Sequence, residues 1–286
     1  MIPAKFDYVR PSSLPEAVEA LAGGGDDAKV IAGGQSLLPL LRLRLAYPEL
    51  LVDIGGLGEL SGVRDAGDVL VIGAMTTMYS LIRDPIVREH CGLIAAAAGT
   101  VADPAVRHRA TIGGSLAHAD PAGDLPAVIS ALDGTLIATG PGGVREIAAA
   151  DFFVDYLTTA LAPGEILTAI RVPKLGPGWG FHYEKFQPTA QAWAIVGVAA
   201  LARRADGHVA EARVGLTNMG TVPVRARAAE AAAAGAEASR QALAAAGANA
   251  DEGTDPPNDL RAAADYRRHL ARVLTGRALA GAAGVS

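Results

Sequence analysis

Cysteine, aromatic residues and long hydrophobic runs are all scarce in this 286-residue chain. Its single cysteine, Cys91, excludes an internal disulfide, and it excludes an iron–sulfur cluster held by this chain alone, because such clusters need several thiolates. The simplest interpretation of Cys91 is a small core residue near a helix end, not a catalytic thiol. No uninterrupted apolar run reaches membrane-spanning length, so we expect no membrane span.

Basic charge is not in excess either, since the net charge is -5 and aromatic residues make up only 5% of the chain. A nucleic-acid-binding protein favours a basic face and aromatic stacking platforms, so we expect no nucleic-acid partner. The first residues lack the basic-then-apolar layout of a signal peptide, which indicates a cytoplasmic protein. Half of the residues are hydrophobic, enough for a sizeable core in two domains or in one domain with an added lobe.

Several common catalytic and nucleotide-binding patterns are missing. The six histidines show no metal-ligand spacing, and no serine stands in a G-x-S-x-G frame, so we predict no metal ligands and no acid/base or nucleophilic residue. Neither the G-x-G-x-x-G fingerprint nor a Walker loop is present. A nucleotide cofactor would therefore be bound by another fold.

Two glycine-containing stretches of similar design are present. In the first, an apolar segment at 29–32 stops at Gly-Gly-Gln-Ser (33–36), and the second is Thr-Ile-Gly-Gly-Ser at 111–115. Glycines allow positive φ and close ligand approach, and N–H groups gathered in one loop suit a phosphate. Either Gly-Gly alone is compatible with an ordinary tight turn. Together they favour two loops that hold a diphosphate from both sides.

Hydrophobic patterning predicts three regions of α+β structure. Residues 1–55 show a βαβ-like pattern, 56–176 alternate strands with helices, and 177–286 follow a cluster of Pro and Gly at 173–178. In the last region we expect three strands followed by helices. The expected strands are 29–32, 50–54, 69–73, 135–138, 166–172, 181–186, 194–202 and 210–217, and the principal expected helices are 12–22, 36–45, 76–82, 86–99, 120–132, 228–246 and 260–280.

Longer motifs around the glycines carry a family resemblance. They are Ala-Gly-Gly-Gln-Ser-Leu-Leu-Pro (32–39) followed by Leu-Arg-Leu-Arg-Leu (41–45), Thr-Ile-Gly-Gly-Ser-Leu-Ala-His-Ala-Asp-Pro (111–121), Pro-Gly-Glu-Ile-Leu (163–167), Tyr-Glu-Lys (183–185) and Gly-Leu-Thr-Asn-Met-Gly (215–220). On these motifs the chain resembles the FAD-binding medium subunits of molybdenum hydroxylases, in the xanthine dehydrogenase family. Within that family it is most similar to the aerobic carbon monoxide dehydrogenase type.

The resemblance implies a vanillyl-alcohol-oxidase/PCMH-type FAD-binding fold: two α/β subdomains plus a C-terminal three-stranded sheet with helices. It implies FAD in this chain, with the molybdenum cofactor on a large partner subunit and 2Fe-2S clusters on a small one. Electrons would pass from the 2Fe-2S subunit through the flavin to an external acceptor, in a heterohexamer. The residues that it marks as cofactor-binding are Ala32, Gly33, Gly34, Gln35, Ser36, Val101, Thr111, Gly113, Gly114, Ser115, Asp124, Leu167, Lys185 and Trp193.

Individual residues are open to more than one interpretation. Asp124 is expected to accept a hydrogen bond from the cofactor, whereas Asp120 fits a helix cap better than an acid/base role. Trp193 is either an aromatic neighbour of the flavin or a core residue at a strand start. Gln35 stands where the carbon monoxide dehydrogenase type commonly has His, so a subunit acting with an N-heterocycle dehydrogenase is an alternative. The sequence is also compatible with a stand-alone flavin oxidoreductase and with a non-enzymatic scaffold.

Overall fold

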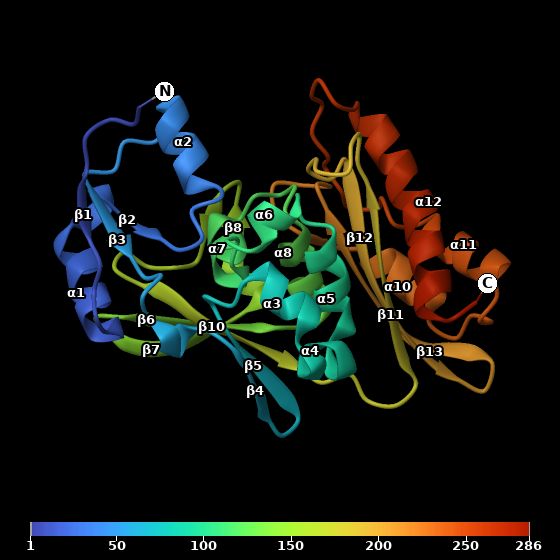
Figure 1. Cartoon of the computed structure of the whole chain (residues 1–286). Coiled ribbons are helices and arrows are strands. Elements are labelled where there is room, and N and C mark those ends of the chain that lie inside the picture. Colours follow the sequence, from blue (N-terminus) through green and yellow to red (C-terminus); the bar gives the residue numbers. More distant parts are fainter. Residues whose placement is uncertain (1, 286) are drawn as a thin grey trace.

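The first of three main β-sheets lies at the N-terminal end of the computed structural model, which describes residues 2–285 (Figure 1). Its strands are all parallel, in the order β1-β3-β2. Ser13 caps the first helix by accepting a hydrogen bond from the N–H of Glu16. The elements are β1 (Asp7–Val9), α1 (Leu14–Gly23), β2 (Ala28–Ile31), α2 (Leu37–Leu43) and β3 (Leu50–Asp53).

The second sheet is antiparallel and has the order β4-β5-β10-β6-β7. Its strands are β4 (Val63–Ala66), β5 (Val69–Gly73), β6 (Thr135–Gly140), β7 (Gly143–Ala148) and β10 (Ile166–Pro173). Short helices connect them: α3 (Met78–Arg83), α4 (Pro85–His90), α5 (Gly92–Gly99), α6 (Pro104–Arg107), α7 (Ile112–His118), α8 (Asp124–Ala131) and α9 (Ala149–Phe152). A small hairpin, β8 (Phe153–Asp155) and β9 (Thr158–Thr159), follows α9.

The third sheet has the order β11-β12-β13-β14 and is antiparallel. It comprises β11 (Trp179–Phe186), β12 (Val196–Ala205), β13 (His208–Thr217) and β14 (Val224–Arg225), followed by α10 (Arg227–Ala233), α11 (Arg240–Gly247) and α12 (Ala264–Ala282). Helices α5 and α8 cover one face of this sheet, and α12 covers the other (Figure 1).

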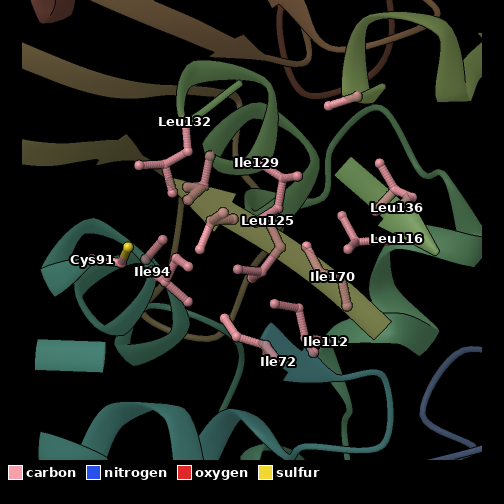
Figure 2. Close-up of a cluster of buried hydrophobic side chains, with 14 of the residues drawn as sticks. Ile72, Cys91, Ile94, Ile112, Leu116, Leu125, Ile129, Leu132, Leu136 and Ile170 are labelled. Atoms are coloured by element: carbon pink, nitrogen blue, oxygen red, sulfur yellow. The ribbon is translucent and has the colours of Figure 1, made fainter. Parts of the chain in front are cut away.

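Strand β12 is therefore buried on both faces, which explains its unbroken apolar run. Val198 and Ala200 belong to the core beneath α12, whereas Ala199 and Leu201 belong to the core shared with the second sheet. In that shared core, Leu125 and Ile129 of α8 pack over Ile170 of β10 (Figure 2). One continuous core thus joins the second and third sheets.

The expected strands and most expected helices are present, with small shifts of their ends. The predicted single helix over 86–99 is wrong, because Cys91 leaves helical geometry (φ -143°, ψ 46°) and divides α4 from α5. The predicted helix over 228–246 is also divided, since Gly235 takes φ +79° and Ser239 caps a new helix. A short fourth strand, β14, adds to the three strands predicted for the C-terminal sheet.

Strands β1, β4 and β7 were not predicted from the sequence, because they are short and mostly exposed and so have little apolar pattern. Between Ile2 and Val285, no helix combines the length and apolar character that a bilayer crossing demands. Over the same residues, no three His, Cys, Asp or Glu side chains gather as a metal site would require.

Cys91 lies in the shared core (Figure 2) and has no exposed surface. Its thiol donates to the carbonyl of Pro173 over 3.4 Å. Burial raises the pKa of this thiol to about 12. At pH 8 we expect iodoacetamide to label the folded chain about a thousandfold more slowly than the urea-unfolded chain, because the thiolate is suppressed. Equal rates, measured by mass spectrometry with Cys91→Ser as the unlabelled control, would contradict this assignment.

Candidate functional site

A cavity of about 490 Å³ opens where the three sheets approach one another. Its size falls in the range of roughly 300–1,000 Å³ that is usual for small-molecule sites. Its wall takes residues from the end of β2, from α7, from the start of β10 and from the end of β11. All fourteen predicted cofactor-binding residues line it: Ala32, Gly33, Gly34, Gln35, Ser36, Val101, Thr111, Gly113, Gly114, Ser115, Asp124, Leu167, Lys185 and Trp193.

The first glycine stretch is a loop between β2 and α2. Gly34 takes φ +73°, a conformation that favours glycine, and the Gln35 side chain donates to the carbonyl of Gly33 over 3.1 Å. Across residues 2–285, the four N–H groups of 33–36 donate to no other protein atom. Four consecutive free N–H groups on a cavity wall form a cradle for an anion such as a phosphate.

The second glycine stretch is not a loop, contrary to the prediction. Thr111 caps helix α7, and its hydroxyl accepts from the N–H of Gly114 over 3.1 Å. The N–H of Gly113 donates to the carbonyl of Ala74 over 2.8 Å, and the N–H of Ser115 donates to the carbonyl of Thr111 over 3.0 Å. The backbone donors of Gly113, Gly114 and Ser115 are therefore already used. Over the described chain the Ser115 hydroxyl makes no protein hydrogen bond, so it is free to face a ligand.

The glycines of both stretches allow chain segments to touch. A Cβ atom on Gly33 would lie 2.1 Å from the carbonyl oxygen of Arg109, just before the second stretch. A Cβ on Gly113 would lie 2.4 Å from the Cβ of Ala74. The two stretches, almost eighty residues apart in the sequence, thus form adjoining parts of one wall.

A buried network of three side chains supports another part of the wall, where Asp124 and Lys185 line the cavity. Asp124 and Lys185 each have only 4% of the side chain exposed, and their charged groups lie 2.9 Å apart. The Tyr183 hydroxyl donates to the second carboxylate oxygen of Asp124 over 2.6 Å. Lys185 also donates to the carbonyl of Thr100 over 3.1 Å. Each carboxylate oxygen has a protein donor, while both keep capacity for a further hydrogen bond.

The protonation of this network follows from its burial. Burial raises the pKa of the Asp124 carboxyl, and the Lys185 ammonium and the Tyr183 hydroxyl oppose that rise. Burial and the adjacent Asp124 carboxylate raise the pKa of Tyr183 well above its ordinary value. The phenol therefore stays protonated at neutral pH and acts as a donor to Asp124.

Asp120 does not cap a helix, contrary to the prediction. Its carboxylate accepts from the N–H of Ala122 over 2.9 Å, whereas Gly123 is the N-cap of α8. The Asp120 carboxylate lies 3.9 Å from Nε2 of His118, and both residues line the cavity. His118 was not predicted as a site residue, although it lies one helical turn after Ser115 on α7.

The remaining predicted residues lie at an apolar part of the cavity. Leu167 is buried, Val101 is half-buried, and Trp193 has 43% of its surface exposed. The interpretation of Trp193 as a core residue at a strand start is therefore wrong. Several lining residues were not predicted from the sequence, because tertiary packing alone brings them to the cavity: Leu40, Ile54, Met75, Met78, Leu161 and Ile166.

Comparison with known proteins assigns the family. A model described as the FAD binding domain in molybdopterin dehydrogenase matches residues 4–175, more than half of the chain. The chain belongs to this family. Residues 181–282 match the CO dehydrogenase flavoprotein C-terminal domain. These matches confirm the predicted resemblance to the FAD-binding subunits of molybdenum hydroxylases and the assignment as an oxidoreductase flavoprotein subunit.

Individual relatives match over nearly their whole length. The carbon monoxide dehydrogenase medium chain of Hydrogenophaga pseudoflava is 40% identical, over 98% of this chain and 97% of that protein. The 6-hydroxypseudooxynicotine dehydrogenase complex subunit alpha of Paenarthrobacter nicotinovorans is 37% identical, over 98% and 95%. The solved structure of reconstituted CO dehydrogenase from Oligotropha carboxidovorans matches with a TM-score of 0.97 at 39% identity, over all of both chains. The predicted fold is confirmed.

The buried ion pair generates a stability prediction. Lys185→Met removes the cation beside a buried carboxylate, so we expect it to lower the free energy of unfolding by about 3–5 kcal/mol in urea titrations. The double variant Asp124→Asn with Lys185→Met should recover most of that loss.

Lys174 pairs with the half-exposed Asp65 over 2.6 Å and provides the matched control. Lys174→Met should cost less than about 1 kcal/mol, because the solvent screens a more exposed pair. Similar losses of unfolding free energy for Lys185→Met and Lys174→Met would show that the buried Asp124–Lys185 pair contributes no more to stability than an exposed pair.

Proposed function

We propose that the chain binds FAD in this cavity and acts as the flavoprotein subunit of a molybdenum hydroxylase of the carbon monoxide dehydrogenase type. It would accept electrons from a 2Fe-2S subunit and pass them to an external acceptor. The observation that carries the proposal is the run of four N–H groups at 33–36, in a stretch that lines the cavity, none of which donates to an atom of residues 2–285. Membership of an FAD-binding family supports a diphosphate as the anion that these donors would bind.

The residues present fit FAD. Gly33 and Gly34 belong to the run of N–H groups that donate to no atom of residues 2–285, and Ser115 adds a hydroxyl from the adjoining stretch. Leu167, Val101 and Trp193 provide apolar and aromatic surface of the kind that a flat ring system needs. Bound FAD supplies the redox chemistry, since the protein contributes binding, orientation and electrostatics.

The chain's own polar residues would orient and tune the cofactor. Lys185 is held in place by Asp124 and by the carbonyl of Thr100, so its ammonium has a fixed position on the wall. A fixed cation in a water-poor site stabilises negative charge that develops nearby. Asp124 offsets part of that effect, and no acid/base residue of the chain is needed.

The partners in this proposal follow from the family and from the cysteine content. A chain with one buried cysteine cannot hold 2Fe-2S clusters, so these would belong to a small subunit and the molybdenum cofactor to a large one. The relatives named as medium chains have the same length range as this chain. A cytoplasmic heterohexamer with two copies of each subunit is the assembly that we propose.

An N-heterocycle dehydrogenase is a second candidate for the complex. The 37% identical relative is named as a subunit of a 6-hydroxypseudooxynicotine dehydrogenase complex. Gln35 occupies the position where the carbon monoxide dehydrogenase type commonly has His. Assay of the purified complex with carbon monoxide and with an N-heterocycle would separate the two candidates.

The FAD-binding prediction is tested by absorption spectroscopy of the purified chain. After addition of FAD and desalting, we expect flavin bands near roughly 370 and 450 nm with about one FAD per chain. Co-expression with candidate large and small subunits is the matching experiment for the complex. A folded chain that retains no flavin either alone or with those subunits would contradict the proposal.

The ion pair also predicts opposite shifts of the flavin midpoint potential. Lys185→Met should make the potential more negative, because the reduced anionic ring loses a nearby cation and keeps the Asp124 charge. Asp124→Asn should make it more positive. Spectroelectrochemical titration measures both shifts, with Lys174→Met as the distant control. Unchanged potentials in both variants would remove the electrostatic role of the pair.

A further inference from the structure

Trp193 reaches the cavity from a loop that links β11 to β12. The loop is closed at its base, where the N–H of Ile195 donates to the carbonyl of Phe186 over 2.8 Å. Gln191, Ala192 and Trp193 are its members on the cavity wall. With 43% of Trp193 exposed, few neighbours hold the side chain itself in place. Its position must therefore depend on how the base of the loop is held.

The first turn of α12 holds that base from both sides. Arg267 has no exposed surface, and its guanidinium donates to the carbonyl of Ile195 over 2.5 Å. The adjacent Tyr266 packs edge-on against Phe186, with ring centroids 6.2 Å apart. Two consecutive residues of one helix thus contact the two residues that close the loop.

Each of the three guanidinium nitrogens of Arg267 makes a hydrogen bond, which fixes the geometry of the group. Its Nε donates to the carbonyl of Pro257 over 3.1 Å, and its Nη2 pairs with Asp259 over 2.8 Å. A planar guanidinium with three directed bonds has little freedom to move. A buried charge with such partners is costly to disturb, so the carbonyl of Ile195 is held firmly.

Asn218 supports the same segment from the opposite strand end. Its amide donates to the carbonyls of Ala194 and Ile195, over 2.9 and 3.3 Å. Its backbone takes φ +63°, and its own N–H donates to the carbonyl of Pro121 over 2.8 Å. Asn218 therefore ties the Trp193 loop to the segment that leads into Asp124.

We propose that Arg267 and Asn218 are positioning residues for the cofactor: they hold the Ala194–Ile195 backbone and thereby fix Trp193 against the FAD ring. The inference rests on the proposed FAD-binding function and assigns part of it to the C-terminal helix, which does not line the cavity. Loss of either residue would let Trp193 move away and would speed release of FAD.

A mutant cycle on the full chain loaded with FAD tests this inference. The FAD dissociation rate is measured by the return of flavin fluorescence after dilution. Trp193→Ala should raise the rate about tenfold through loss of aromatic contact, and Arg267→Met and Asn218→Gly should each raise it by a similar factor. Arg268→Met, the same change one residue further along α12, should alter it less than about twofold.

The decisive comparison is made in the Trp193→Ala background. If Arg267 acts through Trp193, adding Arg267→Met there should change the dissociation rate less than about twofold. An equal fold-change in both backgrounds would overturn the inference, as would a Trp193→Ala chain that releases FAD at the wild-type rate.

Asn218→Gly keeps the test sound if Arg267→Met does not fold. Glycine accepts φ +63°, so this variant removes the two side-chain hydrogen bonds without backbone strain. The same comparison with Trp193→Ala then decides the outcome. A wild-type chain that binds no FAD would instead overturn the proposed function, which the absorption spectrum reports separately.

Discussion

The contact between Gly33 and the carbonyl of Arg109 is the constraint on which the cavity depends. It brings the loop after β2 against the segment that enters α7, so close that residue 33 has no room for a side chain. The first and second sheets are separate, and within residues 2–285 no strand of one pairs with a strand of the other. The glycine contact therefore sets how near the two layers come and where the space between them opens.

The third sheet closes the cavity through hydrogen bonds made by polar side chains near the end of β11. Tyr183 and Lys185 lie two residues apart on β11, and both reach Asp124 at the start of α8. The same α8 packs on β12 and β13 through its apolar face. Helix α8 thus holds the third sheet through its apolar contacts, and it holds the Tyr183 and Lys185 side chains through the Asp124 carboxylate. Packing and site geometry are consequently coupled in this part of the chain.

Strong local patterns made much of the fold predictable. The long strands β10, β12 and β13 were found from their apolar residues, and the glycine stretches with their flanking motifs marked the cavity residues. The helical form of the second stretch was not predicted, because Gly-Gly disfavours a helix and the Thr111 cap with the Ala74 contact overrides that preference. His118 was missed for the same reason, since its place one turn after Ser115 follows only once this stretch is helical.

The two-sided burial of β12 has a consequence for how the chain is made. Tyr183, Ala199 and Leu201 complete the apolar core over α5 and α8, yet they are synthesised only after both helices. The first 175 residues therefore leave the ribosome with an apolar surface still open on these helices. Until β11 and β12 have been synthesised, that surface is the part of the nascent chain most prone to aggregation. It is also where a chaperone would bind most strongly.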